Sequence, residues 1–312
     1  MMNLPDFPPI PLEALAVIAK LQQVSVSQIT LLPHIGITNK LYGLGDHLML
    51  RIPRNHPHII SLAHKEAKVV PAARAAGVHT PAILLFDDSC TLLPVPYTLY
   101  ERVPGETLGL LDLEPEATPH VWRALGRDLA RLHTSITKAD LPLEEVSPCE
   151  DLRAAPEALA EAGFFTSMEA RWLERLLDQL APHALAEIPQ RFLHGDTQTT
   201  NMMVESGGLD YLAVLDWGSS GWGDVAWDFL GIPLRAVPFM LEGHREIAPL
   251  DADETAEARI LWRHLQVAIW LMRRGPQPTH SWAERPWAMF LEIMRFLLES
   301  SDPRWRAYLP NR

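Results

Sequence analysis

A short polar segment in the second half of the chain carries the side chains best suited to chemistry. It reads HGDTQTTN, and a second segment, VLDWG, follows it after a stretch with the pattern of two strands. Asp196 and Asn201 lie five positions apart in the first segment, on an expected loop, and Asp216 ends the strand in the second. Because a hairpin brings its two ends together, the amide oxygen of Asn201 and the carboxylate of Asp216 can converge on a hard cation such as Mg2+.

This arrangement leaves Asp196 as a second carboxylate near the metal. Phosphoryl transfer requires an oxygen-liganded metal on the phosphates and a carboxylate that orients the attacking hydroxyl group and accepts its proton. A metal-dependent hydrolase with His194, Asp196 and Asp216 as ligands is an alternative from another class. Histidine ligation would favour a softer metal such as Zn2+ or Mn2+.

The elements around these residues are expected to be mostly helical, with one β-hairpin that positions the polar side chains. The hairpin strands are predicted over 201–205 and 209–215, joined by Ser206-Gly207-Gly208. Apolar residues at helical spacing predict several helices, over 122–136, over 172–180 and at least twice between 253 and 300.

The N-terminal part of the chain has a different pattern. A proline suited to a first helical turn opens an amphipathic helix over 11–23. Short segments bounded by turn residues predict strands, over 28–35, 38–44, 47–53, 82–86 and 97–103. A helix over 61–76 is inserted between the third and fourth strands and ends at Gly77. We therefore predict a two-lobed α+β protein, with an antiparallel sheet lobe over 1–102 and a helical lobe over 103–312.

Composition and charge restrict the classes of partner. The chain has 312 residues, and 39 acidic against 27 basic side chains give a formal charge of -12. Such a field repels nucleic acid backbones and anionic membranes, and it mildly favours a cationic small molecule as substrate. The two cysteines cannot form a disulfide framework, and no apolar run reaches the roughly 18 residues that span a bilayer. Since the N-terminus also lacks the features of a signal peptide, we expect a cytoplasmic protein.

With these motifs in order, the sequence resembles the aminoglycoside phosphotransferase and choline kinase superfamily, within the wider protein-kinase-like group. The family's catalytic loop, His-Gly-Asp followed by four residues and Asn, corresponds to HGDTQTTN, and its metal motif corresponds to VLDWG. A later Gly-Asp motif with an aspartate four residues on corresponds to Gly223-Asp224 and Asp228. The resemblance covers almost the whole chain.

The resemblance implies a kinase-like fold that uses ATP with Mg2+. It implies that Asp196 is the catalytic base and that Asn201 and Asp216 are the magnesium ligands. His194 would brace the catalytic loop by hydrogen bonds, and the two aspartates of the later motif would anchor the segment after the metal site.

The four residues between Asp196 and Asn201 differ from the loop sequence that is most common in the family. They read Thr-Gln-Thr-Thr instead of Leu-His-Pro-Gly. Because these positions face the acceptor side of the cleft in such enzymes, the departure affects the identity of the acceptor and not the class of reaction. Seven residues separate Asp216 from Asp224, too few for a segment that presents a peptide, so a small-molecule acceptor is expected.

On the nucleotide side, Gly36-Ile37-Thr38-Asn39 resembles the family's phosphate-covering turn, with Thr38 and Asn39 next to the phosphates. A plain β-turn is the alternative. The segment Tyr100–Gly105 resembles the hinge between the lobes. There the carbonyl group of Glu101 and the amide group of Val103 would bind adenine.

Arg51, in the third predicted strand, matches the place of the kinase lysine that contacts the phosphates. Its permanent charge and paired donors suit phosphate oxygens. Glu66, in the following helix, is its expected ion-pair partner. The alternative is a surface pair between Lys65 and Glu66.

Several other residues have interpretations of their own. We interpret His133 as a packing residue at a helix end. Trp217, Trp222 and Trp227 crowd the metal loop, where they either wall the substrate pocket or belong to the core. An acceptor such as choline, homoserine or a sugar, antibiotic resistance through an aminoglycoside acceptor, and a nucleotide-binding pseudokinase scaffold all remain alternatives.

Overall fold

The computed structural model describes residues 5–32, 38–146, 148–207, 209–276 and 282–308. The N-terminal lobe is built on a five-stranded antiparallel sheet with the strand order β1-β2-β3-β5-β4. The strands span Ile29–Leu31 (β1), Asn39–Leu44 (β2), Leu48–Pro53 (β3), Ile83–Asp87 (β4) and Tyr97–Glu101 (β5). This sheet confirms the predicted α+β fold class, although β1 is shorter than predicted and residues 33–35 of that prediction lie outside the described residues.

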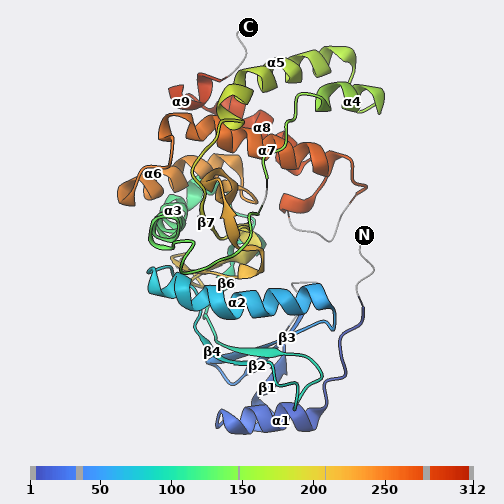
Figure 1. The fold of residues 1–312 in the computed structure, drawn as a ribbon, viewed down its shortest axis with the longest axis vertical. Helices are drawn as coiled ribbons and strands as arrows, with labels where there is room; N and C mark the ends of the chain where they lie inside the picture. The colour runs from blue at the N-terminus through green and yellow to red at the C-terminus, as the bar shows by residue number, and fades with distance from the viewer. Residues whose placement is uncertain (1–4, 33–37, 147, 208, 277–281, 309–312) are drawn as a thin grey trace.

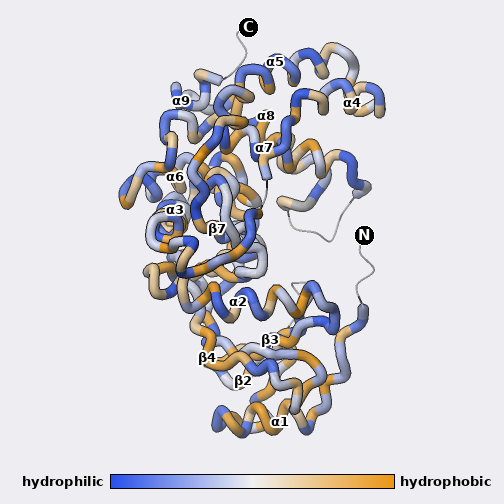
Figure 2. The backbone as a smooth tube through the Cα atoms, viewed as in Figure 1, coloured by the Kyte–Doolittle hydropathy of each residue, from blue (hydrophilic) through white to orange (hydrophobic). Residues whose placement is uncertain are grey.

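Two helices cover the two faces of the sheet (Figure 1), α1 (Leu12–Leu21) and α2 (Pro57–Ala75). The alternation along β3 explains the arrangement. Leu50 and Ile52 are buried in one cluster with Leu15 and Ile18 of α1. Because successive side chains of a strand point to opposite faces, Arg51 points to the α2 side of the sheet. The amphipathic pattern of α1 is visible in Figure 2, where hydrophobic and hydrophilic residues alternate along the helix.

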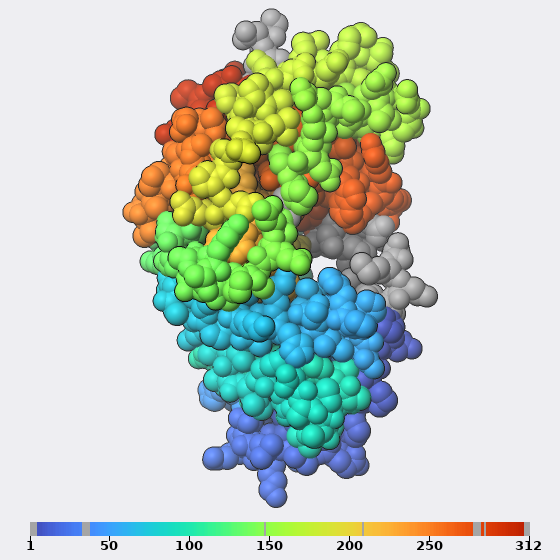
Figure 3. Space-filling view, viewed as in Figure 1, coloured from blue at the N-terminus to red at the C-terminus, as the bar shows by residue number. Residues whose placement is uncertain are grey.

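The helix α2 starts earlier than the sequence predicts. It begins at Pro57 instead of Ser61, because a proline fits the first turn of a helix, and it contains Pro71. In Figure 1 α2 runs between the sheet and the helical lobe, and Figure 3 shows the surface hollowed where α2 meets that lobe. A residue on α2 can therefore contact both lobes.

The rest of the chain forms the helical lobe. Four of its helices were predicted, namely α3 (Pro119–Ser135), α5 (Ser167–Ala184), α7 (Ala256–Met272) and α8 (Ala288–Glu299). Three were not, namely α4 (Ala155–Glu161), α6 (Val237–Ile247) and α9 (Pro303–Arg306). The central helix of the lobe is α7, which is buried along nearly its whole length. No described helix is long and apolar enough to cross a membrane.

The missed helix α6 packs very closely on α3. A Cβ atom on Gly126 of α3 would lie 2.0 Å from the carbonyl oxygen of Met240, and one on Gly243 of α6 would lie 2.0 Å from that of Arg123. Both positions therefore require glycine, whose low helix propensity hides α6 from a sequence-based prediction.

Two small antiparallel sheets position the polar segments. One consists of β6 (Glu106–Thr107), β8 (Met202–Val204) and β9 (Tyr211–Val214), and the other of β7 (Arg191–Leu193) and β10 (Gly221–Gly223). The predicted hairpin is β8–β9, and Gly208 of its turn lies outside the described residues. The predicted strand began at Asn201, but Asn201 belongs to the 3-10 turn Thr199–Asn201 and β8 begins at Met202. A lobe boundary between residues 102 and 103 stays a prediction.

Candidate active site

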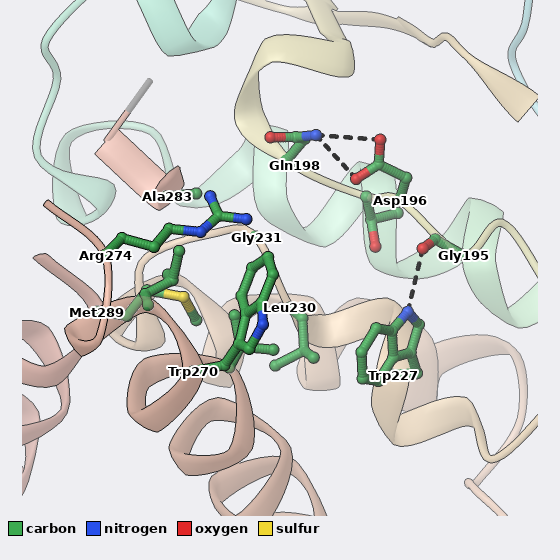
Figure 4. A pocket seen from close by; sticks show the side chains of 13 residues that line it. Gly195, Asp196, Gln198, Trp227, Leu230, Gly231, Trp270, Arg274, Ala283 and Met289 are labelled. Atoms are coloured by element: carbon green, nitrogen blue, oxygen red, sulfur yellow. Dashed lines mark hydrogen bonds between the residues drawn. The ribbon is translucent and has the colours of Figure 1, made fainter. Parts of the chain in front are cut away.

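The loop between β7 and β8 brings Asp196 and Asn201 into contact. The side-chain amide of Asn201 donates to the Asp196 carboxylate at 3.1 Å and to the Asp196 carbonyl oxygen at 2.8 Å. The side-chain amide of Gln198 donates to both carboxylate oxygens of Asp196, at 2.8 and 3.0 Å (Figure 4). Asp196 is therefore held in a fixed orientation by two amide groups from its own loop.

The β8–β9 hairpin brings Asp216 to the same place. Met202 pairs with Val214, and the backbone N–H of Leu215 donates to the carbonyl oxygen of Asn201 at 2.8 Å. Asp216 follows with a φ of 65°, a left-handed conformation that is uncommon for an aspartate and turns the chain sharply after the strand. The hairpin thus places Asn201 beside the residue that precedes Asp216, as the sequence predicts.

His194 is buried and joins the catalytic loop to the end of β9. The backbone N–H of Asp196 donates to Nδ1 of His194 at 3.2 Å, and Nε2 lies 3.0 Å from the Leu215 carbonyl oxygen. A neutral imidazole that carries its proton on Nε2 satisfies both contacts. Burial lowers the pKa of His194, and the opposing effect of Asp228 and Asp216 is smaller. This is the bracing geometry that the family resemblance implies.

Asp228, in the 3-10 turn Val225–Phe229, holds the start of the same loop. Its carboxylate accepts from the backbone N–H of His194 at 2.8 Å and from that of Gly195 at 2.7 Å. Gly195 has a φ of +85°, and a Cβ atom there would lie 2.3 Å from the carbonyl oxygen of Ser219. Asp224 instead caps that turn through the N–H of Ala226 and pairs with Arg259 of α7. The two aspartates therefore anchor different segments.

His133 is more than the packing residue that we predicted. Its Nε2 lies 2.9 Å from the Asp228 carboxylate, and its Nδ1 lies 3.1 Å from Nε2 of His244 on α6. Nδ1 of His244 lies 2.9 Å from the carbonyl oxygen of Ala248. A buried polar chain thus runs from the end of α6 to the catalytic loop. This polar chain could not be predicted from the sequence, because α6 was not predicted.

Arg51 bridges the two lobes. Its guanidinium lies 2.7 Å from the carboxylate of Glu66 and 3.0 Å from that of Asp216. Glu66 is buried and also accepts from the hydroxyl group of Tyr100 at 3.2 Å and from the backbone N–H of Trp217 at 2.8 Å. The alternative of a surface pair between Lys65 and Glu66 is therefore wrong, since Lys65 instead donates to the carbonyl oxygen of Ser220.

These contacts shift the ionisation of the three groups. Burial raises the pKa of the Glu66 carboxyl, and the neighbouring Arg51 offsets only part of that effect. Burial also acts to raise the pKa of Asp216, but the charge and hydrogen bond of Arg51, together with smaller effects of Glu66 and His194, hold the pKa below its ordinary value. Burial acts to lower the pKa of Arg51, whereas Glu66 and Asp216 raise it well above its usual range. Arg51 therefore stays charged between two carboxylates.

The remaining nucleotide-side predictions lie at the strand ends. In the orientation that satisfies its neighbours, the side-chain oxygen of Asn39 accepts from Nε and Nη2 of Arg51 at 2.9 and 2.7 Å, and from the Thr38 hydroxyl group. Gly36 and Ile37 of the predicted phosphate turn lie outside the described residues. Glu101 ends β5, and Val103 follows it in the connection to the helical lobe. Their contacts with a nucleotide stay predictions.

A pocket of about 190 Å3 opens in front of Asp196 (Figure 4). The sequence analysis placed Gln198 of the catalytic loop on the acceptor side, but it did not identify Trp270 of α7 or Arg274 just after α7. The signal for Gln198 was that the four loop positions differ from the sequence most common in the family. Trp270 is an exposed tryptophan on a mostly buried helix, which could have indicated a role in binding. Arg274 had no such signal.

The three tryptophans near the metal loop have different places. Trp227 lines the pocket, and its indole N–H donates to the carbonyl oxygen of Gly195 at 3.0 Å. Trp222 is buried against Phe192 and belongs to the core. Trp217 is buried against the ring of His194 and donates to the hydroxyl group of Thr80. A pocket role therefore fits Trp227 and not Trp222.

The donor set fits a hard cation. Asn201 and Asp216 offer oxygen ligands, and Mg2+ usually binds through one or two protein groups together with phosphates and water. Within the described ranges, no group of three His, Cys, Asp or Glu side chains is arranged to hold a metal by itself.

Comparison with known proteins gives a consistent picture. The model of the phosphotransferase enzyme family matches residues 32–238. Aminoglycoside 2'-phosphotransferase-IIIa, in a GDP complex, is similar in structure with a TM-score of 0.61 at 13% identity, over 84% of this chain and 91% of that chain. Macrolide 2'-phosphotransferase MphH from Brachybacterium faecium has a TM-score of 0.59 at 18% identity, over 97% of this chain and 100% of that one.

A choline/ethanolamine kinase family protein from Mesorhizobium loti has a TM-score of 0.55 at 17% identity, over 90% of each chain. At these identities the structures show a shared two-lobed, kinase-like fold. In sequence, the chain is 26% identical to acyl-CoA dehydrogenase family member 10 of Mus musculus over 200 residues, which are 58% of this chain. That match spans 18% of the length of the mouse protein.

Proposed function

Because the chain belongs to the phosphotransferase enzyme family, we propose that it transfers the γ-phosphate of ATP to a hydroxyl group of a small molecule. The observation that supports this proposal most directly is the position of Arg51. It joins the buried Glu66 of the sheet lobe to Asp216 of the helical lobe, at 2.7 and 3.0 Å. A cation at this point would meet the phosphates of a nucleotide bound between the lobes.

In this proposal Asp196 accepts the proton of the acceptor hydroxyl group. The hydroxyl oxygen forms a bond to the γ-phosphorus, the bond from that phosphorus to the β–γ bridging oxygen breaks, and ADP leaves. Gln198 and Asn201 keep the Asp196 carboxylate oriented. Asn201 and Asp216 would hold Mg2+, which neutralises charge on the phosphates when it is bound.

The backbone around Asp196 supports this role for its carboxylate. His194 fixes the Asp196 N–H, and Asp228 fixes the two preceding N–H groups. Such fixed geometry is what positioning catalysis requires, because a displacement of about 1 Å can cost about 100-fold in rate.

The first experiment measures ATP binding with and without Mg2+ by calorimetry, and the slow release of ADP in the absence of an acceptor. We expect saturable binding that depends on Mg2+, and ADP release that is lost in Asp196→Asn. Asp178→Asn, on the exposed side of α5, is the matched control. Absence of ATP binding would contradict the proposed function, and ADP release that persists in Asp196→Asn would contradict the role of Asp196.

A further inference from the structure

The pocket in front of Asp196 has a lining that distinguishes among classes of acceptor. Its walls are mainly apolar and aromatic, formed by Trp227, Leu230, Trp270 and Met289. Among its described lining residues, Asp196 is the one acidic side chain and Arg274 the one basic side chain. Figure 4 shows Arg274 reaching over Trp270 toward Gln198, on the side of the pocket away from Trp227.

Arg274 is held in place by the ring of Trp270. Its guanidinium carbon lies 3.7 Å from the centre of the Trp270 ring, a cation–π contact that fixes the plane of the group. Among the described side chains, none of the ion pairs includes Arg274. Arg274 therefore brings a positive charge, with a fork of N–H donors, to the side of the pocket away from Trp227.

This lining is unsuited to a polycation or to a free sugar. A cationic acceptor would be repelled by Arg274 and would find no carboxylate besides Asp196 among the described lining residues. A sugar would place several hydroxyl groups against apolar walls, and each unsatisfied hydroxyl group costs about 1–3 kcal/mol. An acceptor with an apolar body and one anionic group avoids both penalties.

We propose that the acceptor is a hydroxylated carboxylic acid with an apolar body. Its hydroxyl group lies at Asp196, its hydrocarbon part lies against Trp227, Leu230 and Met289, and its carboxylate pairs with Arg274. The proposal rests on the proposed function, because it uses Asp196 as the acceptor of the hydroxyl proton. The carboxylate takes no part in the transfer and leaves with the phosphorylated product.

The overall charge of -12 does not prevent anion binding at this point. At physiological salt, charges farther away than a Debye length of about 8 Å are largely screened. A charge-assisted hydrogen bond to arginine contributes about 1.5–3 kcal/mol, which corresponds to a factor of about 10 to 100 in KM. The local charge of Arg274 therefore outweighs the distant field that favoured a cationic acceptor.

The experiment measures acceptor-dependent ADP release by the full chain with ATP and Mg2+. The probes are hydroxyoctanoates that differ in the position of the hydroxyl group, their methyl esters, amino alcohols of the same chain length, and kanamycin. We expect at least one hydroxyoctanoate to stimulate ADP release and to yield a phosphate monoester by mass spectrometry. The corresponding methyl ester should have a KM about 10- to 100-fold higher.

Two arginine variants test the assignment. Arg274→Gln should remove the preference for the acid over its methyl ester, whereas Arg273→Gln, on the exposed neighbouring residue outside the pocket, should keep it. Arg274→Glu should reverse the preference toward the amino alcohol. If Arg274→Gln fails to fold, Arg274→Lys, which keeps the charge but loses the fork, should retain the preference in weakened form.

The outcomes separate this inference from the proposed function. Stimulation by an amino alcohol or kanamycin but not by any hydroxyoctanoate would overturn the inference and leave the kinase assignment intact. The inference is also overturned, and the kinase assignment kept, if Arg274→Gln raises the KM of the acid and of its methyl ester by the same factor. A third such outcome is ATP hydrolysis that depends on Asp196 but is stimulated by none of the probes. Absence of ATP binding would overturn both.

Discussion

The guanidinium group of Arg51 donates a hydrogen bond to the carboxylate of Asp216 at 3.0 Å, although the two residues are 165 positions apart in the chain. The same guanidinium pairs with the buried Glu66. An arginine on the central part of a sheet thus connects the buried acid of α2 to the residue expected to bind metal.

Replacement of Arg51 tests this connection through stability. Arg51→Gln leaves Glu66 buried without its cation, and removal of one partner of a buried pair typically costs about 3–5 kcal/mol. Arg51→Lys should cost less, because a lysine keeps the charge but cannot bond both carboxylates as a fork. Urea unfolding at neutral pH measures both. The matched control is Arg171→Gln on the exposed side of α5, and an Arg51→Gln variant as stable as this control would refute the prediction.

The buried histidines behind the catalytic loop form a chain of hydrogen bonds that ends at Asp228. The chain from Ala248 through His244 and His133 to Asp228 contains three hydrogen bonds, which need three protons. Burial lowers the pKa of His244 to about 3, so this ring is neutral and carries its proton on Nδ1, toward Ala248. Nε2 of His244 then has no proton and accepts from Nδ1 of His133 at 3.1 Å.

This protonation pattern is measurable by 15N NMR of labelled protein at neutral pH. We expect His244 to carry its proton on Nδ1 and not on Nε2, and His133 to carry a proton on Nδ1. Asp228→Asn, by removing an acceptor of the loop N–H groups, should cost about 1–3 kcal/mol in stability. A proton on Nε2 of His244 in the unsubstituted chain would contradict the prediction.

Much of the fold could be predicted because its signals are local. The alternation that buries Leu50 and Ile52 around Arg51 predicts both the strand and the side on which the arginine lies. The spacing of Asn201 and Asp216 around a hairpin turn predicts their proximity in the same way. Hydrophobic period and turn residues are sufficient for such inferences.

The rest depends on contacts between distant segments. The helix α6 was missed because Gly243, which the close approach to α3 requires, weakens its helical pattern. The role of His133 was missed for the same reason, since its partner His244 lies on α6. Arg274 belongs to the pocket through the position of α7 in the lobe, which no local pattern encodes.

Two buried histidines should make the fold sensitive to acid. Burial lowers the pKa of His264 to about 4 and that of His244 to about 3, whereas both residues titrate near 6.5 in an unfolded chain. Between those values the unfolded chain binds protons that the folded chain does not, so the free energy of unfolding decreases as the pH falls below about 6.5. The slope approaches about 1.4 kcal/mol per pH unit for each histidine.

Urea unfolding across this pH range, with His264→Gln as the variant, measures the contribution of one residue. A glutamine can still donate to the Phe229 carbonyl oxygen that His264 contacts, so the fold should persist with a shallower slope. His58→Gln, on the exposed side of α2, should leave the slope unchanged. Equal slopes for His264→Gln and the unsubstituted chain would show that His264 titrates alike in both states.

Gly195 should be essential for activity because a side chain at this position would clash with Ser219, and not only because of its backbone conformation. Its φ is +85°, and a Cβ atom would lie 2.3 Å from the Ser219 carbonyl oxygen. Gly195→Ala must therefore displace the backbone next to Asp196, and a shift of about 1 Å there should lower the rate of ATP hydrolysis about 100-fold or more.

Gly207 is the matched control, because its φ is +82° but no heavy atom of the described residues lies within 4 Å of its Cβ position. Gly207→Ala should cost about 1–2 kcal/mol in stability from the left-handed conformation alone and leave the rate unchanged. Comparable rates for the two alanine variants would show that the contact with Ser219 does not position the catalytic loop.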